Sequence, residues 1–126
     1  TALAVYLARK YGSKKDIKDE IQNKFGYDLN RKLDNIRPDY IFDVSCQGTV
    51  EEGIIAFLES NSWEDSIRNA ISLGGDSDTL ANITGGIAEA FYGVVNNAIK
   101  DRIKEILPGE LWEITENFYN NYCSDI

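Results

Sequence analysis

Apolar residues recur every three or four positions over most of the chain, a spacing that predicts amphipathic helices. In the first quarter the recurring residues are Leu3, Leu7, Tyr11, Ile17, Ile21 and Phe25. Gly12 and Gly26 follow these two stripes, and glycine is the residue that most often ends a helix. Ser13 is followed three residues later by Asp16, which is the pattern of a capping box. The sequence therefore predicts two short helices before residue 27.

Five more helices are predicted downstream from the same spacing and from capping residues. Their expected ranges are 49–60, 62–73, 77–92, 95–107 and 111–122. Thr49 is the expected N-terminal cap of the first of these helices, and Ser62 with Asp65 repeats the capping signature for the second. The Gly74-Gly75 pair is expected to end the second helix, and Pro108 separates the last two.

The segment from Tyr27 to Thr49 has no clear periodicity and is predicted as a long loop. A loop of this length in a small domain is usually functional. Its basic residues Arg31, Lys32 and Arg37 can meet a phosphate group, although exposed basic side chains are more often simply hydrated. No segment shows the alternation of a strand. The prediction is an all-α fold of six or seven helices, in which residues 1–126 form one domain or part of one.

The composition excludes several classes of function. The 126 residues include 13 Lys and Arg against 21 Asp and Glu, a net charge of −8, and no histidine. The acidic surface argues against nucleic-acid or anionic-membrane partners, which need basic residues. Catalysis and zinc binding by histidine are excluded. Cys46 and Cys123 lie far apart in the sequence, and with no secretory or membrane-spanning segment we expect a reduced, cytoplasmic protein.

The chemically most informative segment is Gly74–Asn82, in which Asp76, Asp78 and Thr79 follow a glycine pair. Carboxylate and hydroxyl oxygens are hard ligands that suit Mg²⁺, Mn²⁺ or Ca²⁺. Glycines allow the tight turn that brings both acids to one point. The alternative is that Asp-Ser-Asp-Thr only caps the helix that follows. We expect Thr79 to point inward, because it lies on one helix face with Ile83, Gly86, Ile87 and Ala90.

The segment Ser66–Gly93, with its Gly-Gly-Asp-Ser-Asp-Thr core, resembles the C-terminal signature of the ADP-ribosylglycohydrolases. That family also includes dinitrogenase-reductase-activating glycohydrolase and the J1 crystallins. The segments Ser45–Val50 and Ala56–Leu58 resemble the loop and helix that precede this signature. The resemblance extends from about Ala2 to about Tyr122. It implies an orthogonal bundle of helices around a central cleft.

The resemblance also implies a reaction, a cofactor and a set of site residues. Such enzymes cleave the glycosidic bond between ADP-ribose and an acceptor on a protein or small molecule, with two Mg²⁺ or Mn²⁺ ions. Asp76, Asp78 and Thr79 are the implied metal ligands. The substrate-binding candidates are Ser45, Cys46, Gln47, Gly48, Thr49, Gly74 and Gly75. For residues 45–49 the alternative is a turn that only caps the next helix.

The family's second ligand cluster, a Thr-Asp-Asp sequence, does not occur in these 126 residues. The chain thus looks like the C-terminal half of a family member, with its catalytic acid or base in an N-terminal half. We expect little activity from the chain alone. The exposed face of its first helix, with Leu3, Leu7 and Tyr11, is expected to pack on that half or to drive self-association. The alternatives are a non-catalytic, ADP-ribose-binding or crystallin-like relative, or a helical interaction domain.

Overall fold

The computed structural model describes residues 1–93 and 95–123, and every regular element in these ranges is an α-helix. The chain divides into two compact units, Thr1–Val94 and Val95–Ile126. The helices of the first unit are α1 (Ala2–Tyr11), α2 (Lys14–Phe25), α3 (Leu33–Ile36), α4 (Cys46–Leu58), α5 (Trp63–Ser72) and α6 (Ser77–Tyr92). The second unit contains α7 (Asn97–Ile106) and α8 (Gly109–Tyr122). The all-α prediction is confirmed, with one helix more than expected.

The predicted ends of the early helices are confirmed by their caps. The Ser13 hydroxyl accepts a hydrogen bond of 3.3 Å from the Asp16 backbone N–H at the start of α2. Ser62 does the same for α5, with a bond of 3.1 Å from the Asp65 N–H. Gly12 follows α1 in the left-handed conformation that glycine adopts most easily.

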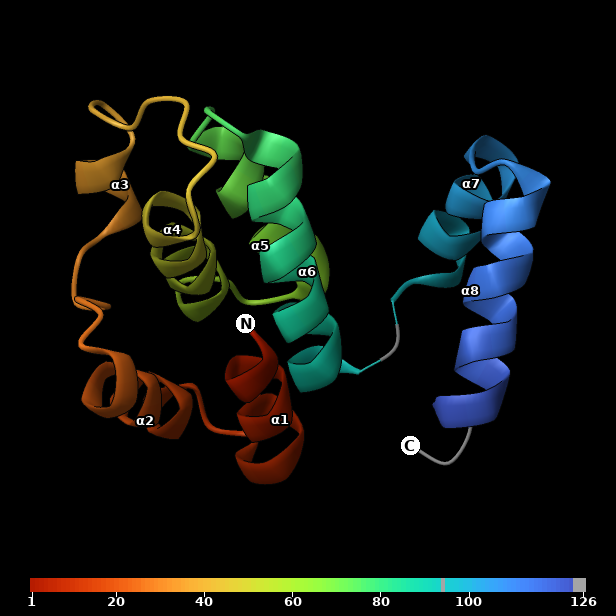
Figure 1. The fold of residues 1–126 in the computed structure, drawn as a ribbon, viewed down its shortest axis with the longest axis horizontal. Coiled ribbons are helices and arrows are strands. Elements are labelled where there is room, and N and C mark those ends of the chain that lie inside the picture. Colours follow the sequence, from red (N-terminus) through yellow and green to blue (C-terminus); the bar gives the residue numbers. More distant parts are fainter. Residues whose placement is uncertain (94, 124–126) are drawn as a thin grey trace. The chain divides into compact units, whose positions relative to one another are not determined.

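The core of the first unit lies where α4, α5 and α6 pack side by side (Figure 1). Phe57 of α4 is fully buried, and its ring meets that of Phe91 edge-to-face with centroids 5.3 Å apart. Ile87 and Leu80 of α6 are also fully buried. Burial of an aliphatic or aromatic side chain of this size contributes on the order of 1.5–3 kcal/mol, so this three-helix contact is the main source of stability.

The first helix is not left without a partner, which corrects the expectation that its apolar face is exposed. It packs against α6 and α2 (Figure 1), and its Ala4, Leu7 and Ala8 are buried. Tyr11 is exposed as expected, and Leu3 is half-buried. The face of Leu7 is therefore occupied within the unit and gives no argument for self-association.

The start of α4 differs from the prediction. The helix begins at Cys46, and its N-terminal cap is Ser45, whose hydroxyl accepts a hydrogen bond of 3.1 Å from the Gly48 N–H. Thr49 is not a cap. It is buried within the first turn, and its hydroxyl donates to the carbonyl oxygens of Ser45 at 2.7 Å and Asp43 at 3.1 Å. A buried hydroxyl needs such partners, and they hold the preceding loop against α4.

The expected long loop contains a short helix and part of the core. Leu29, Leu33 and Ile36 are buried with the other core residues. They are spaced four and three residues apart, which is the helical spacing, but only Leu33–Ile36 forms a helix. This segment, residues 27–44, is thus a strap across α4 that joins the core in its first half, while Ile41, Phe42 and Val44 in its second half are exposed.

The second unit is a pair of helices, α7 and α8. Asn96 caps α7 by accepting a hydrogen bond of 2.8 Å from the Ala98 N–H. The Lys104 ammonium lies 5.2 Å from the centre of the Trp112 ring, so the two helices contact each other. Their observed bounds differ from the predicted ones by two residues or fewer. In the part of the chain that the structure describes, no helix is long and apolar enough to cross a membrane.

Candidate functional site

The glycine pair before α6 adopts the conformation that the sequence predicts. Gly74 and Gly75 have φ angles of +75° and +61°, a region that side chains with a Cβ rarely adopt. α5 ends at Ser72, and α6 starts at Ser77, so the two glycines reverse the chain within four residues. This tight turn, which begins with the glycine turn Gly74-Gly75, places Asp76 and Asp78 at the N-terminal end of α6. Residues 74–79 are called the acidic turn below.

Asp76 occupies the N-cap position of α6, but within the described structure its side chain makes no capping hydrogen bond. Its carboxyl instead lies beside that of Asp78. The side-chain hydrogen bond with Asp76 holds the pKa of Asp78 below its ordinary value. The Thr79 backbone N–H donates to Asp78 Oδ1 at 3.0 Å and lowers that pKa further. Two carboxylates at such close range repel each other unless they share a proton or a cation.

Thr79 does not point inward, contrary to the expectation. It is exposed, as is Gly86, and the buried stripe of α6 consists of Leu80, Thr84, Gly85, Ile87 and Ala88. The predicted face was therefore displaced by about one residue around the helix axis. Thr79 remains next to Asp78 on the open side of the turn, where its hydroxyl is accessible.

The chemistry of these residues agrees with a hard cation, although the ligands are few. Asp76 and Asp78 offer carboxylate oxygens that capping does not use, and Thr79 offers a hydroxyl. Among the described residues there is no group of three or more Asp, Glu, Cys or His side chains placed to hold a metal ion. These three residues can thus supply part of a coordination shell.

The predicted substrate-binding residues at positions 45–49 form the first turn of α4. Ser45 caps this turn, which supports the capping alternative for Ser45, and the Thr49 hydroxyl is engaged by the carbonyls of Ser45 and Asp43 without being a cap. Cys46 and Gln47 are exposed. Gly48 lies against Asp43, because a Cβ at position 48 would lie 2.0 Å from Asp43 Oδ2.

The Asp43 carboxylate organises the approach to this turn. It accepts a hydrogen bond of 2.7 Å from the Ser45 backbone N–H, and this bond holds the pKa of Asp43 below its ordinary value. The N-terminal end of α4 and the loop before it are therefore joined by a charge-assisted hydrogen bond.

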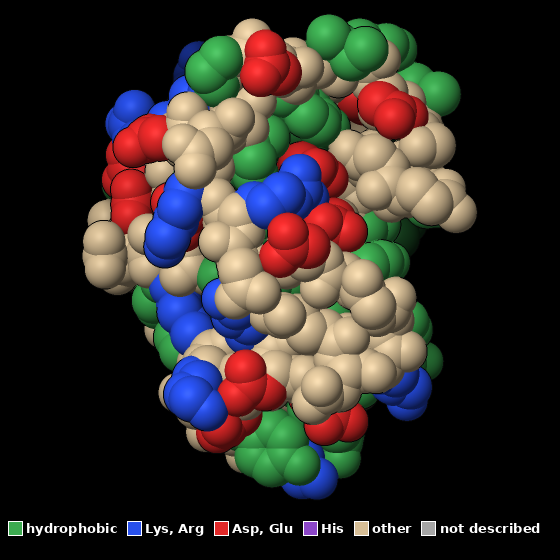
Figure 2. Space-filling view, turned by 90° about the vertical axis from the view of Figure 1, so that its left-hand side faces the viewer, with side chains coloured by type: hydrophobic (Ala, Val, Ile, Leu, Met, Phe, Trp, Pro, Cys, Tyr) green, Lys and Arg blue, Asp and Glu red, His purple; other side chains and the backbone are tan. Residues whose placement is uncertain are grey.

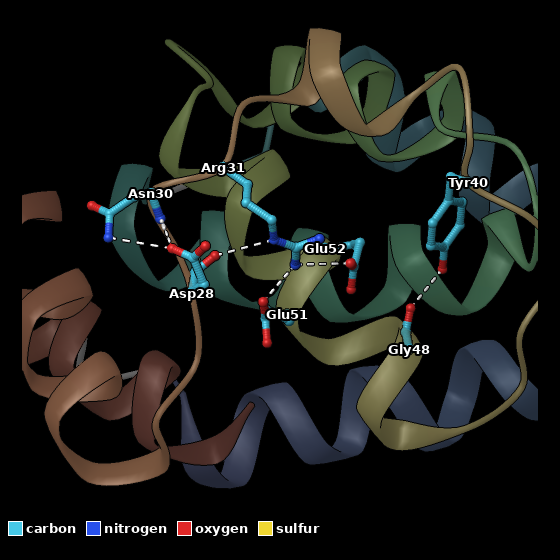
Figure 3. Close-up of polar contacts among 7 residues, drawn as sticks. All are labelled: Asp28, Asn30, Arg31, Tyr40, Gly48, Glu51 and Glu52. Carbon is cyan, nitrogen blue, oxygen red and sulfur yellow. Dashed lines mark hydrogen bonds and ion pairs between the residues drawn. The ribbon is translucent and has the colours of Figure 1, made fainter.

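The structure brings the two predicted segments together through Tyr40, a residue that the sequence gives no reason to select. The Tyr40 ring contacts Gly75, and its hydroxyl donates a hydrogen bond of 2.9 Å to the Gly48 carbonyl (Figure 3). Burial, and next the charge of Glu52, raise the pKa of Tyr40 above its ordinary value. The sequence offers only a weak signal, since Tyr40 is one of three aromatic residues in this loop, with Tyr27 and Phe42.

The basic residues of the strap are paired with acids. Arg31 donates to Glu51 and, at 2.9 Å, to Glu52 (Figure 3), while Arg37 pairs with Asp34. Figure 2 shows the same mixture over a whole face, where basic side chains lie beside acidic ones. This pairing gives no support to a phosphate-binding role for Arg31 or Arg37.

A cavity of about 290 Å³ opens between the strap and α4. It is lined by Arg31, Asn35, Ile36, Asp39, Tyr40 and Glu52. Glu52 is buried, and its Oε2 atom has no hydrogen-bond partner among the described residues. The cavity is small, at the lower limit of the volumes typical of ligand pockets.

Comparison with known proteins adds one finding. The model of the family described as ADP-ribosylglycohydrolase matches residues 2–125. The matched range includes the acidic turn, the first turn of α4 and the strap between them. No solved structure matches the chain.

Proposed function

Because this chain belongs to the ADP-ribosylglycohydrolase family, we propose that it is the metal-binding part of a hydrolase that releases ADP-ribose from an acceptor. One observation supports the proposal more than any other. The adjacent carboxyls of Asp76 and Asp78 stand at the end of a glycine turn, and the Asp76 side chain makes no cap among the described residues. A capping role alone gives no reason to bring two carboxyl groups together.

The proposed cofactor is Mg²⁺, with Mn²⁺ as a substitute, and the complete site is proposed to hold two ions. Asp76, Asp78 and Thr79 are the residues of this chain that would bind the metal, since their oxygens are hard ligands. Bound metal ions in such a site would orient ribose hydroxyls and a water molecule while positive charge develops at the anomeric carbon.

The chain's own residues have three proposed tasks. Asp76 and Asp78 supply negative charge where a cation must bind, and the positive end of the α6 dipole beside them limits the cost of that charge. The exposed start of α4, with Cys46 and Gln47, faces substrate, because a helix N-terminus favours anionic groups such as a pyrophosphate. Gly74 leaves the backbone of the turn open to a close approach, whereas Gly75 is covered by the Tyr40 ring.

One acidic pair is too few ligands for two ions. Mg²⁺ prefers six oxygens and gives up water reluctantly, so a second cluster, expected as Thr-Asp-Asp, has to come from a segment outside residues 1–126. We therefore propose that this chain alone binds metal weakly and turns over little substrate, and that the general acid or base belongs to the other segment.

The proposal is tested by following ADP-ribose release from an ADP-ribosylated peptide in millimolar Mg²⁺. The chain is assayed alone and after fusion to a segment that carries the Thr-Asp-Asp sequence. The proposal expects release from the fusion only, and loss of release when Asp76 is replaced by Asn. Tight ADP-ribose binding by the fusion without any release would favour the non-catalytic, crystallin-like alternative. Equal release by the fusion and its Asp76→Asn variant would contradict the role of the acidic turn.

A further inference from the structure

We propose that Tyr40 is a positioning residue, which holds the Gly74-Gly75 turn against the first turn of α4 and thereby orients Asp76 and Asp78. The importance of this role for metal binding rests on the proposed function of the acidic turn. The two contacts of Tyr40 are observed independently of that function.

The first contact is between the Tyr40 ring and the Gly75 backbone. A Cβ at position 75 would lie 2.7 Å from Tyr40 Cε1 and 3.1 Å from the Ile41 carbonyl oxygen, so the strap lies directly on this glycine. At Gly74 no atom would lie within 4 Å of an added Cβ. The strap therefore presses on one of the two glycines only, the one that directly precedes Asp76.

The second contact fixes the other end of the same ring. The Tyr40 hydroxyl donates to the Gly48 carbonyl at 2.9 Å, in the first turn of α4 (Figure 3). Thr49, in that same turn, is bound to the carbonyls of Ser45 and Asp43. The ring is thus anchored on a hydrogen-bonded helix end, and it can transmit the rigidity of that end to the glycine turn.

The glycine turn needs such support because its own residues do little to fix its backbone conformation. Two successive glycines have the largest conformational freedom of any residue pair, and Asp76 makes no side-chain cap among the described residues. Without an outside contact, the direction of the Asp76 carboxyl would vary widely. Residues behind a metal ligand that fix its orientation typically change metal affinity by about 10–100-fold when they are removed.

The experiment compares variants of the full 126-residue chain in two measurements. The first is the affinity for Mn²⁺, read from the electron paramagnetic resonance signal of the free ion. The second needs no metal and measures amide hydrogen exchange at Leu80 by NMR, because the Leu80 N–H donates to the Asp76 carbonyl at 3.0 Å and reports opening of the turn. Circular dichroism checks that each variant is folded.

The expected result is a graded loss. Tyr40→Leu removes both contacts, and we expect about 10-fold weaker Mn²⁺ binding and faster exchange at Leu80. Tyr40→Phe keeps the ring on Gly75 and should recover most of both values. Gly75→Ala should behave like Tyr40→Leu. Gly74→Ala is the matched control, because it carries the same backbone strain without the collision, and its effect should be smaller.

Several outcomes decide the matter. A folded Tyr40→Leu variant with unchanged Mn²⁺ affinity and unchanged exchange would overturn the proposal, as would equal effects of Gly74→Ala and Gly75→Ala. If Tyr40→Leu does not fold, the comparison of Tyr40→Phe with the two glycine variants gives the answer. If no variant binds Mn²⁺ but exchange follows the expected order, the role of Tyr40 stands and the proposed metal site fails.

Discussion

The Thr84 hydroxyl donates a hydrogen bond of 2.8 Å to the Gly53 carbonyl, inside the contact between α4 and α6. Both residues are buried, and a Cβ at Gly53 would lie 3.1 Å from Ile83 Cγ2, so the two helices approach closely here. α4 begins at the predicted substrate-binding turn, and α6 begins at the acidic pair. This contact therefore fixes the distance between the two halves of the candidate site.

Replacing Thr84 by Val keeps the shape of the side chain but removes its donor. We expect the free energy of unfolding to fall by about 0.5–1.5 kcal/mol, the usual net value of a hydrogen bond. Urea denaturation measures the change. Thr115→Val is the matched control, since the exposed Thr115 hydroxyl also bonds to a carbonyl four residues earlier, at 2.9 Å. Equal changes in the free energy of unfolding for the two variants would show that the buried Thr84 hydrogen bond stabilises the fold no more than an exposed one.

Lys14 is expected to matter more for stability than its neighbour Lys15. Its ammonium donates to the Leu58 carbonyl at 3.2 Å, at the C-terminal end of α4, and lies 5.0 Å from the Phe57 ring. A cation at this end of a helix interacts favourably with the dipole.

We therefore expect Lys14→Met to lower the free energy of unfolding by about 1–2 kcal/mol, from the lost charge–dipole and hydrogen-bond contributions. Lys15→Met is the control, because the Lys15 side chain is 82% exposed and pairs only with Asp19 among the described residues. Exposed pairs of this kind contribute less than about 1 kcal/mol. Thermal or urea unfolding that gives Lys15→Met the larger effect would contradict this assignment.

The Asp43 carboxylate makes the start of α4 sensitive to acid. Its pKa in the folded chain is below the ordinary value of 3.8, because the ionised form accepts the Ser45 N–H. The contribution to stability is thus fully present above that ordinary value and is lost as pH falls through the folded-state pKa.

The check is a comparison of urea midpoints for the wild type and Asp43→Asn as the pH is lowered from neutral to below the ordinary pKa. The wild type should lose stability more steeply in the acidic range, because only it can be protonated at this position. Parallel profiles for the two proteins would show that the Ser45 contact does not stabilise the fold.

The sequence predicted those parts of the fold that local interactions determine. Ser13 and Ser62 cap helices as expected, because their hydroxyls bond to backbone groups three residues away. The bounds of α6, Ser77–Tyr92, are also as predicted, since a glycine stands near each end. The acidic turn could be identified because its residues are adjacent in the chain.

Features that depend on distant contacts were not predicted. Thr49 carries the signature of a cap, yet burial against Asp43 places it inside α4. The strap has no regular period because Arg31 and Tyr40 are held by residues of α4 and by the glycine turn. Thr79 was assigned to the wrong face because the apolar positions of α6 allow two neighbouring stripes, and only packing against α4 and α5 selects one.

The central claim, that the acidic turn binds a divalent cation, is tested most directly by NMR during titration with Mn²⁺. A bound paramagnetic ion broadens the signals of nearby residues. The account predicts selective broadening at residues 74–80, abolished in Asp76→Asn and Asp78→Asn and retained in Asp65→Asn, whose carboxylate bonds to the Asn61 N–H at 2.8 Å on α5. Broadening elsewhere in the chain, or the same broadening at residues 74–80 in all three variants, would contradict it.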